Sequence, residues 1–257
     1  MGTSKIHAQR LASGILSRRG GFRSEFLDFD RGIRVGHLEP SERITQLLKA
    51  RLAERHGCRM LCDRWGRGVY WQWICWVPEP NRRAKPSSSG HNFASAKFFV
   101  AIDREGRTFQ SGLQIERAPV RPPEDDWGIR VEKDWDWHVF RRALRGERLP
   151  RLIASLLREG FRVRVGPFES LTEFDRRAWD PAACLRRTRF SPPEWGGFQL
   201  FWPMSEREVR DSAGEDIVDA VEAVFEAVAP AMQLCMFAPC LRLGEGGAAP
   251  RQGTVAR

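Results

Sequence analysis

The chain has 257 residues, 42% of them hydrophobic and including 10 Trp and 16 Phe, which is enough to bury a sizeable core and excludes disorder throughout. It contains no apolar run that could span a bilayer and no apolar core of a secretion signal, so we expect a cytoplasmic protein without a membrane partner. The formal net charge of +9 favours anionic partners such as nucleic acid or an acidic protein. Six Cys without repeated spacing indicate free thiols.

The composition divides the chain into three parts. Residues 1–38 are rich in Gly, Arg and Ser and predict a basic, poorly structured arm. Residues 39–243 are expected to form a single domain, and residues 244–257 a disordered tail. Three aromatic residues of the arm are expected to dock on the domain, namely Phe22, Phe26 and Phe29.

The domain opens with a predicted helix and two strands. Ser41 is placed as the helix N-cap, and Gly57 follows the helix as a stop signal. A short strand over 59–63 is followed by a predicted turn, Trp65-Gly66-Arg67-Gly68, and a second strand over 69–77.

The second strand is unusually aromatic. Single-strand nucleic-acid binders stack bases on such residues, but they interleave them with basic side chains, and this strand has none. A packed core strand is therefore favoured, with Trp71 and Trp73 buried against the first helix and the strand over 97–102.

A β-hairpin over 97–117 is predicted to be the centre of the sheet. Its first strand is apolar on both faces, and its second strand alternates between apolar and polar residues. Gly106 is expected to take a positive φ in the turn. Gly112 is expected to reflect crowding by a large neighbour such as Trp71.

The second half of the chain is mostly helical. Helices are predicted around 137–144 and 152–157, and a last helix is expected to end at Pro230. Strands are predicted over 161–165 and 198–202. Three capping-box patterns are expected to start helices: Ser170-x-x-Glu173, Ser205-x-x-Glu208 and Ser212-x-x-Glu215. The predicted class is α+β, with a mixed, mostly antiparallel sheet built on central hairpins and covered by helices.

From Phe98 to Met236 this order of elements resembles an uncharacterised bacterial and fungal domain family. Its members usually carry an R-F-S-K-D-K-x-P-Y-K segment, which is absent here. Only the basic loop from Asn81 to Lys85 lies where that segment would fall. The resemblance implies the fold and no particular activity.

One acidic cluster is a candidate for chemistry. In an extended conformation Asp134, Asp136 and His138 would share a face and could serve a metal-dependent enzyme. In a helix, which the following apolar stripe favours, they would spread around the axis. No nucleotide-binding, nucleophile-elbow or zinc-protease motif is present, and we predict no cofactor and no metal.

Charge is distributed unevenly along the chain. Residues 141–189 contain thirteen Arg against six acidic residues, whereas residues 206–226 contain eight acidic residues against two Arg. We predict a binding face for a polyanion or an acidic protein, made of Arg82, Arg83, Arg162, Arg164, Arg186 and Arg187. Two alternatives remain open, which are ion pairs within the chain and a homodimer joined through the basic and acidic faces.

Overall fold

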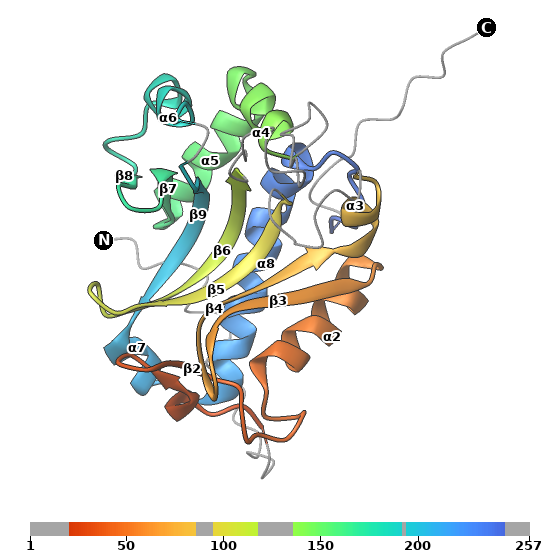
Figure 1. Ribbon diagram of the computed structural model, residues 1–257, viewed down its shortest axis with the longest axis vertical. Helices are drawn as coiled ribbons and strands as arrows, with labels where there is room; N and C mark the ends of the chain where they lie inside the picture. The colour runs from red at the N-terminus through yellow and green to blue at the C-terminus, as the bar shows by residue number, and fades with distance from the viewer. Residues whose placement is uncertain (1–20, 86–94, 118–135, 192–193, 245–257) are drawn as a thin grey trace, which may run out of the picture.

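The computed structural model describes residues 21–85, 95–117, 136–191 and 194–244. Its strands form one antiparallel sheet with the order β1-β2-β4-β5-β6-β9-β7-β8, and β3 pairs with β4 (Figure 1). Helices and strands are both present and do not alternate as βαβ units, so the predicted α+β class is confirmed. None of the helices in these ranges is long and apolar enough to cross a membrane.

The elements have the following bounds. The strands are β1 (Leu27–Asp28), β2 (Gly32–Arg34), β3 (Met60–Arg67), β4 (Tyr70–Pro78), β5 (Lys97–Asp103), β6 (Thr108–Arg117), β7 (Arg162–Pro167), β8 (Thr172–Phe174) and β9 (Gly196–Ser205). The helices are η1 (Ser24–Phe26), α2 (Ile44–His56), α3 (Glu79–Arg83), α4 (Asp136–Arg145), α5 (Arg148–Glu159), α6 (Pro181–Arg187), α7 (Glu206–Arg210) and α8 (Gly214–Cys235).

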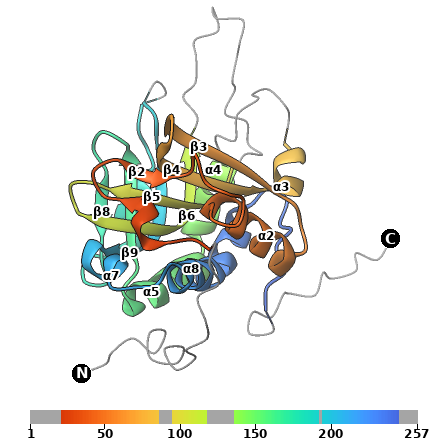
Figure 2. The ribbon, with the colours of Figure 1, turned by 90° about the horizontal axis from the view of Figure 1, so that it is seen from below.

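Helix α8 is the main cover of the sheet. It contacts β6, α2, α4 and α5, and it runs along one side of the strands (Figures 1 and 2). Its Phe225 ring lies 4.9 Å from Phe98 on β5 and 5.8 Å from Trp76 on β4. The helix continues through Pro230, so the predicted end at that residue is wrong. The residues after the proline, including Met232 and Cys235, are fully buried, and their packing offsets the hydrogen bond that Pro230 cannot donate.

Three of the predicted helix starts are also wrong. Helix α2 begins at Ile44 after the N-cap Arg43, which makes no side-chain cap, so Ser41 lies outside it. The pattern at Ser170 belongs to the turn before β8, because pairing of β8 with β7 takes precedence over the local capping signal. The Ser205 capping box forms as predicted. The predicted Ser212 capping box does not, because α8 begins at Gly214 after the N-cap Ala213, which has no capping side chain.

The central hairpin of β5 and β6 is confirmed. Strand β5 has two strands or more on either side, and Phe99 and Val100 are fully buried on its opposite faces. The positive φ of the turn falls on Arg107, at 46°, rather than on Gly106. A Cβ on Gly112 would lie 2.7 Å from the Cα of Phe201, so the crowding comes from strand β9 and not from Trp71.

The sheet extends into the predicted arm. Strands β1 and β2 pair with each other, β2 pairs with β4, and the three phenylalanines of this segment are buried as expected. The folded domain therefore includes residues 21–38, because their aromatic side chains complete the core. Residues 1–20 and 245–257 lie outside the described residues.

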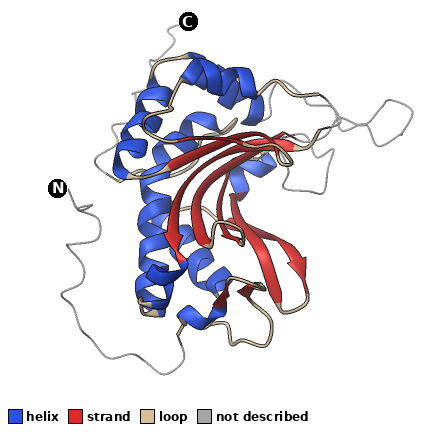
Figure 3. Ribbon diagram, turned by 90° about the vertical axis from the view of Figure 1, so that its left-hand side faces the viewer, coloured by secondary structure: helices blue, strands red, loops and turns tan. Residues whose placement is uncertain are grey.

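The two faces of the sheet differ. One face packs against the helices, and the other is free of described helices, as the side view shows (Figure 3). Trp76 points to the helices and is fully buried, and its indole nitrogen donates to Thr45 O at 3.2 Å. Trp73 points the other way, is only half-buried and donates to Gln114 Oε1 at 2.9 Å. Trp71 is also half-buried, so the predicted burial of Trp71 and Trp73 under the first helix is wrong. The alternation of β4 explains Trp73, which has the opposite parity to Trp76.

Candidate polyanion interface

An open hollow lies at the tip of the β3–β4 hairpin, with a volume of about 700 Å³. It combines cationic and aromatic side chains. Its lining residues are Arg31, Trp65, Gly66, Arg67, Tyr70, Gln72 and Arg104. Arg31, Arg67 and Arg104 are all exposed, and the Trp65 side chain is 62% exposed.

The local sequence of the hairpin shapes this hollow. Strand β3 runs to Arg67, and the turn is Gly68-Val69, so the predicted turn over 65–68 is in its larger part a strand. The pairing register shifts between Trp65 and Gly66, where Gly66 has a φ of 147°. A Cβ on Gly66 would lie 2.8 Å from the Cα of Trp71. Only glycine therefore allows the two strands to approach this closely at the bulge. Trp65 and Arg67 line the same opening because they lie two positions apart on β3.

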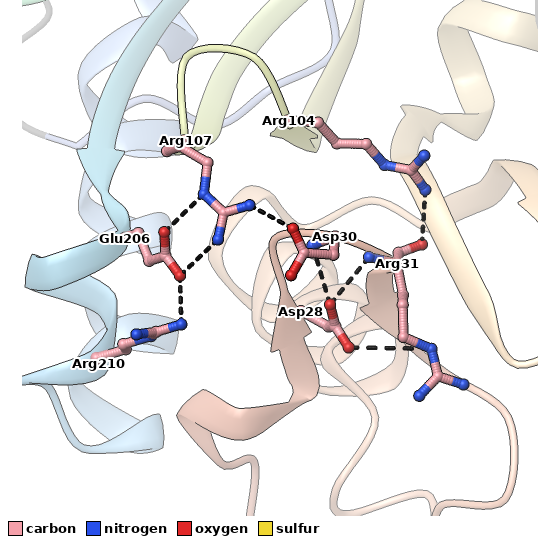
Figure 4. A network of polar contacts seen from close by, with 7 residues as sticks. All are labelled: Asp28, Asp30, Arg31, Arg104, Arg107, Glu206 and Arg210. Atoms are coloured by element: carbon pink, nitrogen blue, oxygen red, sulfur yellow. Dashed lines mark hydrogen bonds and ion pairs between the residues drawn. The ribbon is translucent and has the colours of Figure 1, made fainter.

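A second set of contacts holds Arg31 and Arg104, the two arginines of the hollow that lie outside the β3–β4 hairpin (Figure 4). The guanidinium of Arg31 lies over the Tyr70 ring, 4.1 Å from its centroid. Arg104 Nη2 donates to the carbonyl oxygen of Arg31 at 3.1 Å, and Asp28 Oδ1 accepts from the amide of Arg31 at 2.9 Å. The turn after β1 and the turn after β5 are thereby joined beside the hollow.

The neighbouring ion pairs hold these turns against α7. Arg107 Nε and Nη2 donate to the two carboxylate oxygens of Glu206 at 2.7 and 2.8 Å, and Arg107 also contacts Asp30 at 2.5 Å (Figure 4). The bidentate bond with Arg107 lowers the pKa of Glu206 below its usual value. The network uses the half-exposed Arg107 as the partner of both acids, so the neighbouring Arg104 forms no ion pair with them.

The hollow retains its positive charge. Across the described ranges, its three arginines have one carboxylate contact, between Arg31 Nε and Asp28 Oδ2 at 4.0 Å. Contacts at that distance between exposed groups contribute little, so these guanidinium groups remain available to an anion.

The predicted arginines on β7 have different surroundings. Arg162 and Arg164 lie on the helix-free face, as expected, but both donate to Glu173, at 2.9 and 2.8 Å. Arg164 also contacts Asp103 at 3.2 Å. The acidic neighbours offset the positive charge of this pair.

The other predicted arginines do not join them in one patch. Arg82 and Arg83 lie on α3, which contacts β4, whereas Arg186 and Arg187 lie on α6, which contacts β7 on the far side of the sheet (Figure 1). Arg83 pairs with Glu79 at 2.7 Å and Arg186 with Asp180 at 3.6 Å. The six residues are spread over two sides of the molecule.

The acidic helix also finds partners within the chain. Arg51 of α2 contacts both Asp219 and Glu222 of α8, and Arg55 contacts Glu226 at 3.0 Å. These contacts agree with the alternative of intramolecular ion pairs.

Asp136 occupies a buried structural position. Its side chain has no exposed surface, and its oxygens accept from Asn81 at 2.7 Å, Lys85 at 2.6 Å, and the amides of Ala96 and Phe237 at 2.6 and 2.8 Å. Burial lowers the pKa of Lys85. Because four donors occupy the carboxylate, it has little capacity left for a metal ion.

The other two members of the predicted cluster are His138 and Asp134. His138 is half-buried on α4, and Asp134 lies outside the described residues. Within the described ranges, no group of three or more His, Cys, Asp or Glu side chains could hold a metal ion.

Sequence reasoning missed the hollow because its residues come from three separate segments, which are the turn after β1, the end of the β3–β4 hairpin and the turn after β5. The segment Trp65-Gly66-Arg67-Gly68 was the available signal, since it sets an aromatic and a cationic side chain in a glycine-rich stretch. The aromatic strand does have basic neighbours, but they come from other segments of the sheet. Comparison of the chain with protein-family models, curated proteins and solved structures gives no match.

Proposed function

We propose that this protein binds a polyanion, with nucleic acid as the favoured class, through the arginines of the hollow at the β3–β4 tip. The observation that carries the proposal is the convergence of Arg31, Arg67 and Arg104 on one opening, where their one carboxylate contact among the described residues is 4.0 Å long. Phosphate oxygens are good acceptors for guanidinium groups, and proteins that neutralise phosphates release bound counterions.

The aromatic side chains favour nucleic acid over an acidic protein. Carboxylates of a protein would satisfy the arginines but would not stack on the exposed Trp65 ring. Nucleic acid offers both phosphates and planar bases. The ion-paired arginines on β7 would add at most a weaker secondary contact.

The test is a fluorescence-anisotropy titration of a labelled oligonucleotide at 50 and 200 mM salt. We expect binding that weakens with salt, and we expect Arg67→Gln to lower the slope of log affinity against log salt by about 0.7 if Arg67 contacts one phosphate of a single strand. Arg158→Gln is the matched control, because Arg158 is an exposed arginine on α5, on the helix side of the sheet.

The outcomes separate the alternatives. Arg67→Gln could leave the slope of log affinity against log salt unchanged, while joint replacement of Arg162, Arg164, Arg186 and Arg187 lowers it. That result would show that the interface is the face predicted from the sequence and not the hollow. Absence of binding at 50 mM salt would refute the nucleic-acid proposal, and gel filtration of the same samples would show whether the chain instead pairs with a second copy.

The metal-dependent enzyme remains the alternative function. The hydrogen bonds to Asp136 argue against it. Metal analysis of protein purified without a His tag tests it directly.

A further inference from the structure

Trp65 is an exposed aromatic side chain that the fold does not bury. It is the most exposed of the large hydrophobic side chains in the described ranges, at 62%, and Trp195, at 37%, is another. A single exposed apolar residue is ordinary, whereas a contiguous exposed apolar surface indicates an interaction site, so the neighbours of Trp65 decide its meaning.

The exposed indole belongs to a row of aromatic rings. Trp65 meets Trp195 edge to face, with centroids 6.1 Å apart and planes at 76°. Trp195 meets Phe168 in the same manner, at 5.6 Å and 87°. An edge-to-face contact sets the edge of one ring on a face of the other, so it occupies at most one face of Trp65 and leaves the other face for a stacking partner.

This row begins at the arginine hollow. Trp65 lines the hollow together with Arg67, and the Tyr70 ring on the other side of the opening carries the Arg31 guanidinium. A volume of about 700 Å³ is within the range of pockets for small ligands and is large enough for one nucleotide. The arginines could hold its phosphates while the indole takes its base.

We infer that the ligand is single-stranded nucleic acid, with a base stacked on Trp65 and the adjacent phosphates bound by Arg31, Arg67 and Arg104. The inference rests on the proposed function and narrows it. In a duplex the base faces are stacked on one another and are closed to an indole, whereas a single strand presents every base as a stacking surface. Sequence preference should be slight, because each base has a π-face.

The experiment compares three labelled probes with about the same number of phosphates: a 24-nucleotide oligothymidine, a 12-base-pair duplex, and a 24-unit abasic deoxyribose-phosphate strand. We expect the full chain to bind the oligothymidine about tenfold more tightly than the other two, since one stacked base accounts for a factor of this order. Trp65→Ala should remove that preference and leave the affinities for the duplex and the abasic strand unchanged. Trp65→Phe should retain most of it, because a phenyl ring still stacks.

Arg67→Gln is the contrasting variant. It should weaken binding to all three probes, because it removes a charge and no stacking surface. Circular dichroism and urea unfolding of each variant check that the fold is intact, which we expect since both side chains are exposed.

Each result supports or overturns the inference. Equal, salt-dependent affinity for the three probes would overturn the stacking model and leave the polyanion proposal standing. A Trp65→Ala variant that keeps the preference for oligothymidine would likewise overturn the stacking model and leave the polyanion proposal standing. Failure of all three probes to bind would overturn the proposed function together with this inference. Binding of poly-glutamate as tightly as oligothymidine would indicate an acidic protein as partner.

Discussion

The two faces of the central sheet are formed by the same strands but differ in the side chains they present and in the contacts these make. On the helix side, Trp76, Phe98 and Phe225 pack ring against ring without exposed surface. On the helix-free side, the neighbouring positions are polar or amphipathic. Trp73 donates a hydrogen bond to Gln114, and Lys97 forms an ion pair with Glu116. Burial of aromatic rings on the helix side stabilises the fold. The groups that could contact a ligand lie on the helix-free side and in the hollow at the β3–β4 tip.

The sharpest test of this difference compares two tryptophans. Trp76→Ala should lower the free energy of unfolding by about 3–5 kcal/mol, because it empties a fully buried site and leaves the carbonyl of Thr45 without its donor. Trp65→Ala should cost less than about 1 kcal/mol, because its side chain is mostly exposed. Urea unfolding of both variants measures the difference, and equal losses would contradict the division between the faces.

The helix-free face is not uniformly a surface, and a second prediction concerns its buried ion pair. Lys97 Nζ lies 3.1 Å from Glu116 Oε1, and both side chains are at most 3% exposed. Lys97→Met should cost roughly 3–5 kcal/mol, because it leaves the Glu116 carboxylate buried without its cation. The double variant Lys97→Met with Glu116→Leu should recover most of that loss.

A matched control for this pair lies on the same face. Arg162 and Glu173 are 2.9 Å apart, but their side chains are 50% and 34% exposed. Arg162→Gln should change the free energy of unfolding by no more than about 1 kcal/mol. If Lys97→Met were as mild as Arg162→Gln, the buried pair would contribute no more than an exposed one.

The sequence predicted the elements that depend on local periodicity. The central hairpin and the helices α4, α5 and α8 follow from spacing of apolar residues, and the Ser205 capping box forms as its pattern requires. The class of fold followed from their order. Errors arose where tertiary contacts override a local signal, as at Pro230 and at Ser170.

The candidate site was harder to predict for a physical reason. Arg31 and Arg104 lie in two turns and Arg67 lies at the end of β3, and these segments converge only when β2 and the β3–β4 hairpin are placed in the sheet. Arg162 and Arg164 were identified by alternation, but the acids that neutralise them come from β8 and the end of β5. Sequence spacing identifies the face of a strand that a residue occupies, and it does not identify the partners across the sheet.

The last prediction uses pH to compare the faces. On the helix side, His56 is 2% exposed, its ring is stacked 5.5 Å from Phe98, and its Nδ1 lies 2.9 Å from Arg242 O. A carbonyl only accepts, so Nδ1 carries the proton of the neutral ring, and Nε2 finds no partner among the described residues. Burial is the main cause that lowers the pKa of His56 below 6.5.

A histidine whose folded pKa is lowered costs stability in acid. The unfolded chain takes up a proton as the pH falls through about 6.5, while folded His56 stays neutral, so the free energy of unfolding should decrease from pH 7.5 to pH 5.5. The Glu206 pair acts at lower pH, because its pKa is lowered and its contribution is lost only as the pH falls through that folded value. Urea midpoints of the wild type and His56→Gln at pH 7.5, 6.5 and 5.5 test this, with a flatter pH dependence expected for His56→Gln. Identical slopes for the two proteins would contradict the prediction, because they would mean that His56 does not cause the loss of stability between pH 7.5 and pH 5.5.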